Sequence, residues 1–348
     1  MTHCTAPTSL LLPIGPEHPW LAPLAGFSDL PFRLLCREQG SAAACTEMVS
    51  AKGLIFNNMA TERILATNAQ DHPLVVQVYG PDAETLGRAM DILLQRGAHY
   101  FDLNAGCSVP KVTKTGSGAA LLREPKTLTR IVATMVAKAG EGRVGVKLRL
   151  GWRPGEDVLP DLARTLEDLG VAWLTLHPRW ATQGFSGQAD WDRLARLRDH
   201  VAVPIIASGD LFTAEDARRC LEQTGVNGVM FARGALWDPA IFRKFLSLGP
   251  AGRACSDGRA FHDTPAYSLG IVRRHMELAR THLDDRRAIL AMRTIAPRYL
   301  RQFAGAKSLR TQLTQIESWP QLETVLDEIT LMLNETDIPP DLSLEDAP

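Results

Sequence analysis

A strand-then-helix pattern repeats eight times between residues 18 and 248, and it restricts the fold more than any other feature of the chain. In each unit, a short β-branched run ends in a Gly, Asn or other polar residue, and a helical segment follows. This alternation predicts a parallel sheet, and eight units suit a closed (β/α)8 TIM barrel better than an open sheet. The expected strands are Trp20–Leu24, Ala43–Met48, Pro73–Tyr79, Tyr100–Asn104, Gly145–Arg149, Trp173–His177, Pro204–Ser208 and Gly228–Phe231.

The alternative, an open dinucleotide-binding sheet, is disfavoured because no G-x-G-x-x-G sequence follows the first expected strand. The barrel is therefore expected to fill residues 18–248, after an N-terminal segment at 1–17. The Gly-rich start of residues 249–263 predicts a linker. Residues 264–335 are expected to form a small all-α C-terminal domain, and 336–348 a disordered acidic tail. The expected helices are Ile271–Leu283, Ile289–Phe303, Ser308–Ile316 and Gln321–Leu333.

The charge of the expected helical domain is uneven, although the whole chain has a net charge of only −1. Between residues 264 and 318 there are ten Lys or Arg residues and four acids, and from 319 onward no Lys or Arg occurs. Basic residues of this kind either keep exposed helix faces in solution or form a patch that binds phosphates. Charge alone does not decide between the two.

Six cysteines are scattered along the chain without a C-x-x-C pair, so we expect neither a metal site nor a disulfide framework. No apolar run approaches the roughly 20 residues that cross a bilayer. The expectation is a cytoplasmic protein with reduced thiols. Nothing in the sequence determines its oligomeric state, and a monomer is the simpler expectation.

Polar residues occur where several of the expected strands end, and active sites of such barrels lie at the carboxyl ends of the strands. Gln77, Asn104, Lys147 and His177 would meet at one mouth, and burying four such groups is costly unless they bind a ligand. Gly-flanked turns follow the last two strands, where barrels often bind phosphate. The residues alone therefore predict a barrel that binds a phosphorylated ligand, with Cys107 as a candidate reactive thiol. A non-redox lyase or isomerase of sugar phosphates fits this description too.

The segment Asn104–Val112, followed by Gly118–Leu122, resembles the signature of the tRNA-dihydrouridine synthases. Further similarities to this family follow one another in order over about residues 18–245. They lie at Ala22–Gly26, Asp29–Arg33, Thr46–Met48, Val76–Gly80, Val146–Gly151, His177–Arg179, Gly187–Trp191, Pro204–Asp210 and Val229–Ala235. Trp180 and Ala181 stand where the family usually has Thr and Arg, which leaves the RNA target open.

The resemblance implies an enzyme that reduces the C5=C6 bond of uridines in tRNA, with FMN as cofactor and NADPH as electron donor. A hydride would pass from the flavin to C6, and Cys107, as a thiol, would deliver a proton to C5. The implied substrate-binding residues are Asn104 and Arg179, with Arg286, Arg287, Arg293 and Arg298 facing the tRNA backbone. The implied cofactor-binding residues are Pro23, Leu24, Ala25, Gln77, Lys147, His177, Ser208, Gly209, Asp210, Ala232 and Arg233.

Two alternatives stay open. One is an FMN-dependent barrel that reduces a small metabolite, an oxidoreductase of the dihydroorotate or enone type; it requires the same phosphate site but no basic helical domain. The other is a barrel that binds RNA without catalysis, which the presence of Cys107, Lys147 and His177 disfavours.

Overall fold

The structure is a computed structural model, and it describes residues 12–249, 264–301 and 307–336. The chain divides into two compact units, Met1–Ala235 with Ala240–Phe261 and Leu236–Pro239 with His262–Pro348. The expected linker lies almost entirely outside the described residues, as do most of the expected N-terminal segment and acidic tail.

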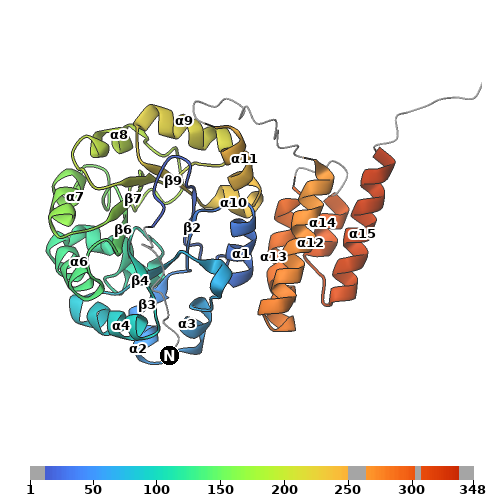
Figure 1. The fold of residues 1–348 in the computed structure, drawn as a ribbon, viewed down its shortest axis with the longest axis horizontal. Helices are drawn as coiled ribbons and strands as arrows, with labels where there is room; N and C mark the ends of the chain where they lie inside the picture. Colours follow the sequence, from blue (N-terminus) through green and yellow to red (C-terminus); the bar gives the residue numbers. More distant parts are fainter. Residues whose placement is uncertain (1–11, 250–263, 302–306, 337–348) are drawn as a thin grey trace, which may run out of the picture. The chain divides into compact units, whose positions relative to one another are not determined.

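The first unit is a closed barrel of eight parallel strands, which confirms the predicted fold (Figure 1). Each strand pairs with its neighbour around the ring, and pairings of β2 with β4 and of β1 with β9 complete the closure. The eight strands are β1 (Trp20–Leu21), β2 (Ala43–Cys45), β4 (Leu74–Tyr79), β5 (Tyr100–Ala105), β6 (Val144–Arg149), β7 (Trp173–His177), β8 (Ile205–Ala207) and β9 (Gly228–Phe231).

The second expected strand, Ala43–Met48, is shorter than predicted. It ends at Cys45, and the chain pairs with β4 again only at β3 (Val49–Ser50). At the interruption the Thr46 hydroxyl accepts a hydrogen bond from Gln77 N at 3.1 Å, where a backbone carbonyl would otherwise serve. The chain therefore leaves the barrel at the level where the polar residues begin.

Helices surround the strands, as Figure 1 shows. Capping side chains explain where two of the longer helices start: Asp82 accepts from Thr85 N before α4, and Thr213 and Asp216 form a capping box at α9. The helices are α1 (Leu30–Glu38), α2 (Ala51–Ile55), α3 (Met59–Ile64), α4 (Ala83–Gln95), α5 (Pro110–Thr113), α6 (Pro125–Ala139), α7 (Leu159–Asp168), α8 (Asp192–Arg198), α9 (Ala214–Thr224), α10 (Arg233–Trp237) and α11 (Ile241–Ser247).

The half of the barrel interior nearest the amino ends of the strands is filled by apolar side chains, here called the plug. Trp20 and Trp173 meet edge to face with ring centroids 5.6 Å apart, and Val75, Ile206 and Met230 pack around them. Gly145 is required here, because a Cβ at that position would lie 2.0 Å from the Trp173 ring. The plug fills this end of the barrel interior, so a ligand is expected at the carboxyl ends of the strands.

The second unit confirms the four predicted helices, with bounds that differ by a few residues. They are α12 (Pro265–His282), α13 (Asp285–Tyr299), α14 (Lys307–Leu313) and α15 (Trp319–Thr336). Helix α12 packs against α13 and α15, and α14 packs against the same two helices. Ion pairs Arg273–Asp327 at 2.7 Å and Arg280–Glu323 at 2.9 Å join α12 to α15. Among the described residues, no helix has the length and apolar character that crossing a membrane requires.

Candidate active site

A layer of polar side chains lies directly above the apolar plug. The strand register brings them together, because Gln77 is paired with Asp102 and Asn104 with Lys147 on neighbouring strands. Gln77 and Asp102 are buried, and Lys147 is half-buried at the mouth. Three of the four predicted strand-end residues therefore gather on the β4–β6 side, and His177 follows at the end of β7.

A chain of hydrogen bonds runs from Asp102 to the loop of Cys107. Asp102 Oδ2 accepts from Gln77 Nε2 at 2.7 Å, and Gln77 Oε1 accepts from Asn104 Nδ2 at 2.8 Å. Asn104 Oδ1 then accepts from Cys107 N at 2.9 Å and from Gly106 N at 3.2 Å. The carboxylate can only accept while it is ionised, so it fixes the orientation of both amides and thereby the start of the loop.

The far side of the Cys107 loop is held by the second half of the signature segment. Ala119 N donates to Cys107 O at 2.9 Å. Gly118 has φ +62°, and a Cβ there would lie 2.6 Å from the same carbonyl oxygen. Only glycine permits this approach, which explains physically why Gly118 and Ala119 follow the cysteine at this spacing. The Cys107 side chain itself is only partly buried.

Lys147 is the group most clearly available to a ligand. The structure shows no hydrogen bond or ion pair for its ammonium among the described residues, although burial and the neighbouring Arg149 charge lower its pKa. Below it, burial raises the pKa of Asp102, against the opposing effects of the Gln77 hydrogen bond and the Lys147 charge. An ammonium held in this way favours an electron-rich ligand atom at the barrel mouth.

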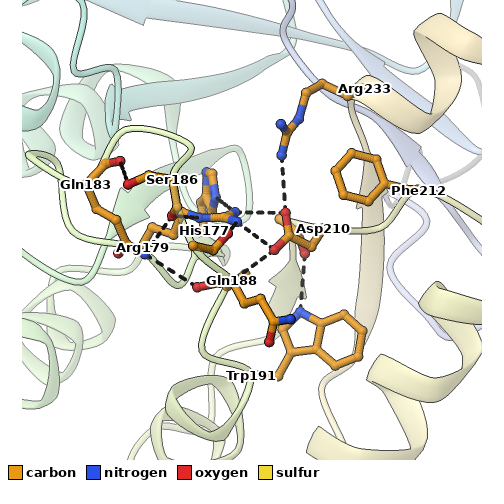
Figure 2. A network of polar contacts seen from close by, with 12 residues as sticks. His177, Arg179, Gln183, Ser186, Gln188, Trp191, Asp210, Phe212 and Arg233 are labelled. Atoms are coloured by element: carbon orange, nitrogen blue, oxygen red, sulfur yellow. Dashed lines mark hydrogen bonds and ion pairs between the residues drawn. The ribbon is translucent and has the colours of Figure 1, made fainter.

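A second network lies across the mouth, where His177, Arg179 and Asp210 meet (Figure 2). Arg179 is 1% exposed and forms a two-pronged ion pair with Asp210, at 2.9 and 2.6 Å. Its other N–H groups donate to His177 Nε2 at 3.1 Å and to the carbonyl oxygens of Ser186 and Gly187. All five donors of the guanidinium are used. In this structure, Arg179 therefore has no N–H group left for the predicted direct contact with the substrate.

The Asp210 carboxylate is similarly engaged. Burial alone would raise its pKa, but hydrogen bonds from Arg179 and Ala189 N bring the pKa below its usual value. Arg233 adds a longer contact to the same carboxylate, at 3.2 Å. The backbone of Asp210, which has φ +55°, is the part that remains for the predicted cofactor contact.

The Arg179 contact determines the tautomer of His177. A guanidinium can only donate, so Nε2 must be the acceptor and the ring hydrogen must lie on Nδ1. Burial and the charges of Lys147, Arg149, Arg179 and Arg233 hold the pKa of His177 far below its usual value. His177 is therefore a neutral imidazole whose Nδ1–H has no acceptor among the described residues.

Nuclear magnetic resonance of histidine-labelled protein tests this assignment. We expect Nδ1 of His177 to carry the hydrogen from about pH 6 to pH 8, and Arg179→Met to give a mixture of tautomers. His177→Gln identifies the signal, and Arg196→Met, an exposed arginine on α8, serves as the control. A hydrogen on Nε2 in the unaltered protein would refute the assignment.

Ser208, Gly209 and Asp210 follow β8, and Gly209 is required by the same histidine. A Cβ at position 209 would lie 2.6 Å from His177 Cδ2. The Gly209 carbonyl accepts from Trp191 Nε1 at 3.2 Å (Figure 2). These residues, which were predicted as cofactor ligands, also hold the imidazole in place.

The remaining predicted barrel residues lie around the rim. Pro23, Leu24 and Ala25 follow β1, and the loop is tied by Glu47 Oε2, which accepts from Gly26 N at 2.5 Å. Ala232 follows β9 directly and is a partly buried residue that packs against the plug. Arg233 begins α10, with its guanidinium 4.7 Å from the ring centre of Phe212. Gln77, by contrast, is 0% exposed, so none of its atoms is accessible for the predicted contact with a cofactor.

The four predicted tRNA contacts belong to the second unit, where they all lie on α13. Arg286 is exposed, and its side chain has no hydrogen bond or ion pair in the described part of the chain. Arg287 pairs with Asp284 at 3.3 Å, and Arg293 Nε donates to Thr314 O at 2.9 Å. Arg298 Nε donates to Thr294 O at 3.0 Å.

Comparison with known proteins now places the chain. The family described as Dihydrouridine synthase (Dus) matches residues 20–334. The chain belongs to the dihydrouridine synthase family. "Probable tRNA-dihydrouridine synthase 1" of Synechocystis sp. is 35% identical over 311 residues, 88% of this chain and 84% of that protein. "tRNA-dihydrouridine synthase B" of Pseudomonas aeruginosa is 30% identical over 301 residues, which are 85% of this chain and 88% of that protein.

Solved structures support the barrel of this dihydrouridine synthase family member at the level of fold. The old yellow enzyme homologue of Zymomonas mobilis matches with a TM-score of 0.52 and 15% identity, over 71% of this chain and 93% of that one.

Sequence reasoning missed three residues of this site. No role was predicted for Asp102, which lies within an otherwise apolar strand. Its position was itself a signal of a functional role, because burying a carboxylate is costly. Glu47 was noted near the end of the second expected strand and within a motif, but no role was predicted for it. Phe185 gave no signal in the sequence, and only its exposure and its neighbours in space distinguish it.

Proposed function

We propose that this protein is a tRNA-dihydrouridine synthase that uses FMN and NADPH. The observation that carries the proposal is the Cys107 loop, held on one side by Asn104 and on the other by Ala119, beside the ammonium of Lys147. Membership of the family supplies the substrate class, and the geometry supplies an acid and a cation at one barrel mouth.

The residues at the mouth fit a flavin mononucleotide. Lys147 offers an ammonium without a partner among the described residues, and His177 offers a neutral N–H donor. Arg233 has a guanidinium at the rim, next to the turn after β8, where barrels often bind phosphate. Lys147 and His177 would hold the flavin ring, and Arg233 with the Ser208–Asp210 backbone would hold the phosphate.

When bound, the reduced flavin would supply the hydride that adds to C6 of the uracil ring. The residues of the chain do the rest. The uridine must leave its stack to enter the mouth, at a cost of a few kcal/mol. Negative charge then develops on C5 and O4, and the nearby Lys147 and Arg149 stabilise it. The Cys107 Sγ–H donates its proton to C5, so the thiol must enter the reaction protonated.

The colour and substrate of the purified protein test the proposal. We expect a flavin absorption spectrum, and NADPH oxidation that depends on unmodified tRNA, with dihydrouridine formed in equal amount. Free uracil and small enones are the comparison substrates. Turnover of enones without turnover of tRNA would favour reduction of a small metabolite instead.

The basic residues of α13 are proposed to bind the tRNA backbone. Arg286→Glu should weaken tRNA binding, and removing one arginine–phosphate interaction should flatten the slope of log Kd against log salt by about one. Arg287→Glu, Arg293→Glu and Arg298→Glu should act in the same direction, while Arg88→Glu on α4 serves as the control. Unchanged affinity in all four α13 variants would place the RNA elsewhere.

A further inference from the structure

Phe185 is an exposed aromatic residue on a firmly held loop. Its side chain is 62% exposed, and it lies between β7 and α8. The backbone is tied on both sides of it, since Gly184 O accepts from Arg149 at 2.8 Å and Ser186 O accepts from Gln183 Nε2 at 2.9 Å. Figure 2 shows Gln183, Ser186 and Arg179 around this loop. The phenyl ring is thus presented to solvent by a backbone that is hydrogen-bonded on either side of it.

The neighbours of the Phe185 ring are mainly cations. The Arg149 guanidinium lies 5.6 Å from the ring centre, and that of Arg233 lies 4.7 Å away. Arg233 is itself placed between Phe185 and Phe212, at 4.7 Å from each ring centre. On the inner side, the His177 ring lies 6.0 Å from Phe185 at an angle of 33°. The ring is therefore at the edge of the candidate active site.

The chemistry of this position selects one kind of occupant. A protein partner would require a contiguous apolar patch, whereas Phe185 is flanked by guanidinium groups. A nucleobase stacks on an aromatic face irrespective of its identity, and the positive charge around the ring favours a polyanion such as RNA over a neutral partner. A rigid ring also loses little side-chain entropy when a base covers it.

We propose that Phe185 is the stacking platform for a tRNA nucleobase next to the uridine that enters the barrel mouth. This inference rests on the proposed function for the identity of the RNA. When the uridine leaves its stack, the adjacent base loses a stacking partner, and the Phe185 ring replaces it. Part of the cost of extruding the uridine is then offset at the rim of the site.

Conservative substitutions of Phe185 test the platform in the full-length, flavin-loaded protein. Phe185→Leu keeps an apolar side chain but removes the aromatic face, and it should weaken binding of an unmodified tRNA transcript about tenfold, the effect of removing one base stack. Phe185→Tyr should restore it. Phe56→Leu, at another exposed phenylalanine of the barrel unit (72% exposed), should leave Kd unchanged.

Flavin content and flavin reduction by NADPH are measured on the same variants and should match the unaltered protein. If Phe185→Leu lost flavin instead of tRNA affinity, the ring would cover the cofactor and the platform would be refuted. Equal tRNA affinity in Phe185→Leu and the unaltered protein would refute it too.

The platform and the proposed function fail in different ways. If the unaltered protein binds tRNA without reducing uridine, and Phe185→Leu weakens that binding, the platform is supported and the proposed synthase function is refuted. If uridine is reduced equally well by both proteins at limiting tRNA, the platform alone falls.

Discussion

Replacing Cys107 by alanine is expected to slow uridine reduction by about 10²–10⁴-fold, the contribution of a well-placed general acid. The variant should still bind flavin, because Cys107 holds its loop through backbone atoms. Cys107 N donates to Asn104 and Cys107 O accepts from Ala119, and neither contact involves the sulfur. Flavin reduction by NADPH should therefore proceed at the normal rate, and only the proton transfer to C5 should be impaired.

A rapid-mixing experiment separates the two half-reactions. The flavin is first reduced by NADPH, and its reoxidation by unmodified tRNA is then followed by absorbance. Cys220→Ala on α9 is the matched control, because that thiol is buried away from the mouth and should leave both rates unchanged. Reoxidation of Cys107→Ala by tRNA at the normal rate would show that another group donates the proton.

The ends of the strands could be predicted from the sequence because parallel strands present their carboxyl ends at one edge. That rule brought Gln77, Asn104, Lys147 and His177 together correctly in space. The rule does not say which side chains pair with one another. The Gln77 amide is hydrogen-bonded to Asp102 and Asn104, and this pairing follows only from the register of β4 against β5.

Arg179 is a second residue whose position could be predicted but whose partners could not. Its position after β7 was predictable, and an arginine at a barrel mouth resembles a ligand-binding group. Its partners come from Asp210, thirty-one positions later, and from the carbonyl groups of a loop whose path no local propensity determines. The interruption of the second strand at Thr46 has a similar origin, because it depends on a hydrogen bond to Gln77 on the next strand.

The loop after β1, which contains Pro23, Leu24 and Ala25, depends on a buried ion pair below it. Arg33 and Asp71 are both 0% exposed, and their closest contact is 2.7 Å. The guanidinium also donates to Ser28 O at 2.7 Å and to Ala66 O at 2.6 Å. The pair therefore ties the end of this loop to the segment before β4, a separation of 38 positions along the chain.

Asp71→Ala is expected to destabilise the protein by about 3–5 kcal/mol, because it leaves the Arg33 guanidinium buried without a counter-charge. That is a large part of the roughly 5–15 kcal/mol that stabilise a typical domain. A decrease of about 10 °C in Tm should follow for a unit of this size. The measurement is thermal and urea unfolding of the full chain.

The exposed pair Arg96–Glu62, with an N···O distance of 2.6 Å, is the matched control for Arg33–Asp71. Glu62→Ala should cost less than about 1 kcal/mol, since both of its groups are solvated. In the double variant Arg33→Met with Asp71→Leu, the isolated charge disappears, so we expect it to be more stable than Asp71→Ala. It should not reach the stability of the unaltered protein, because the carbonyl groups of Ser28 and Ala66 lose their donors. Equal losses for Asp71→Ala and Glu62→Ala would mean that water reaches Arg33 in solution and that the pair does not hold the loop.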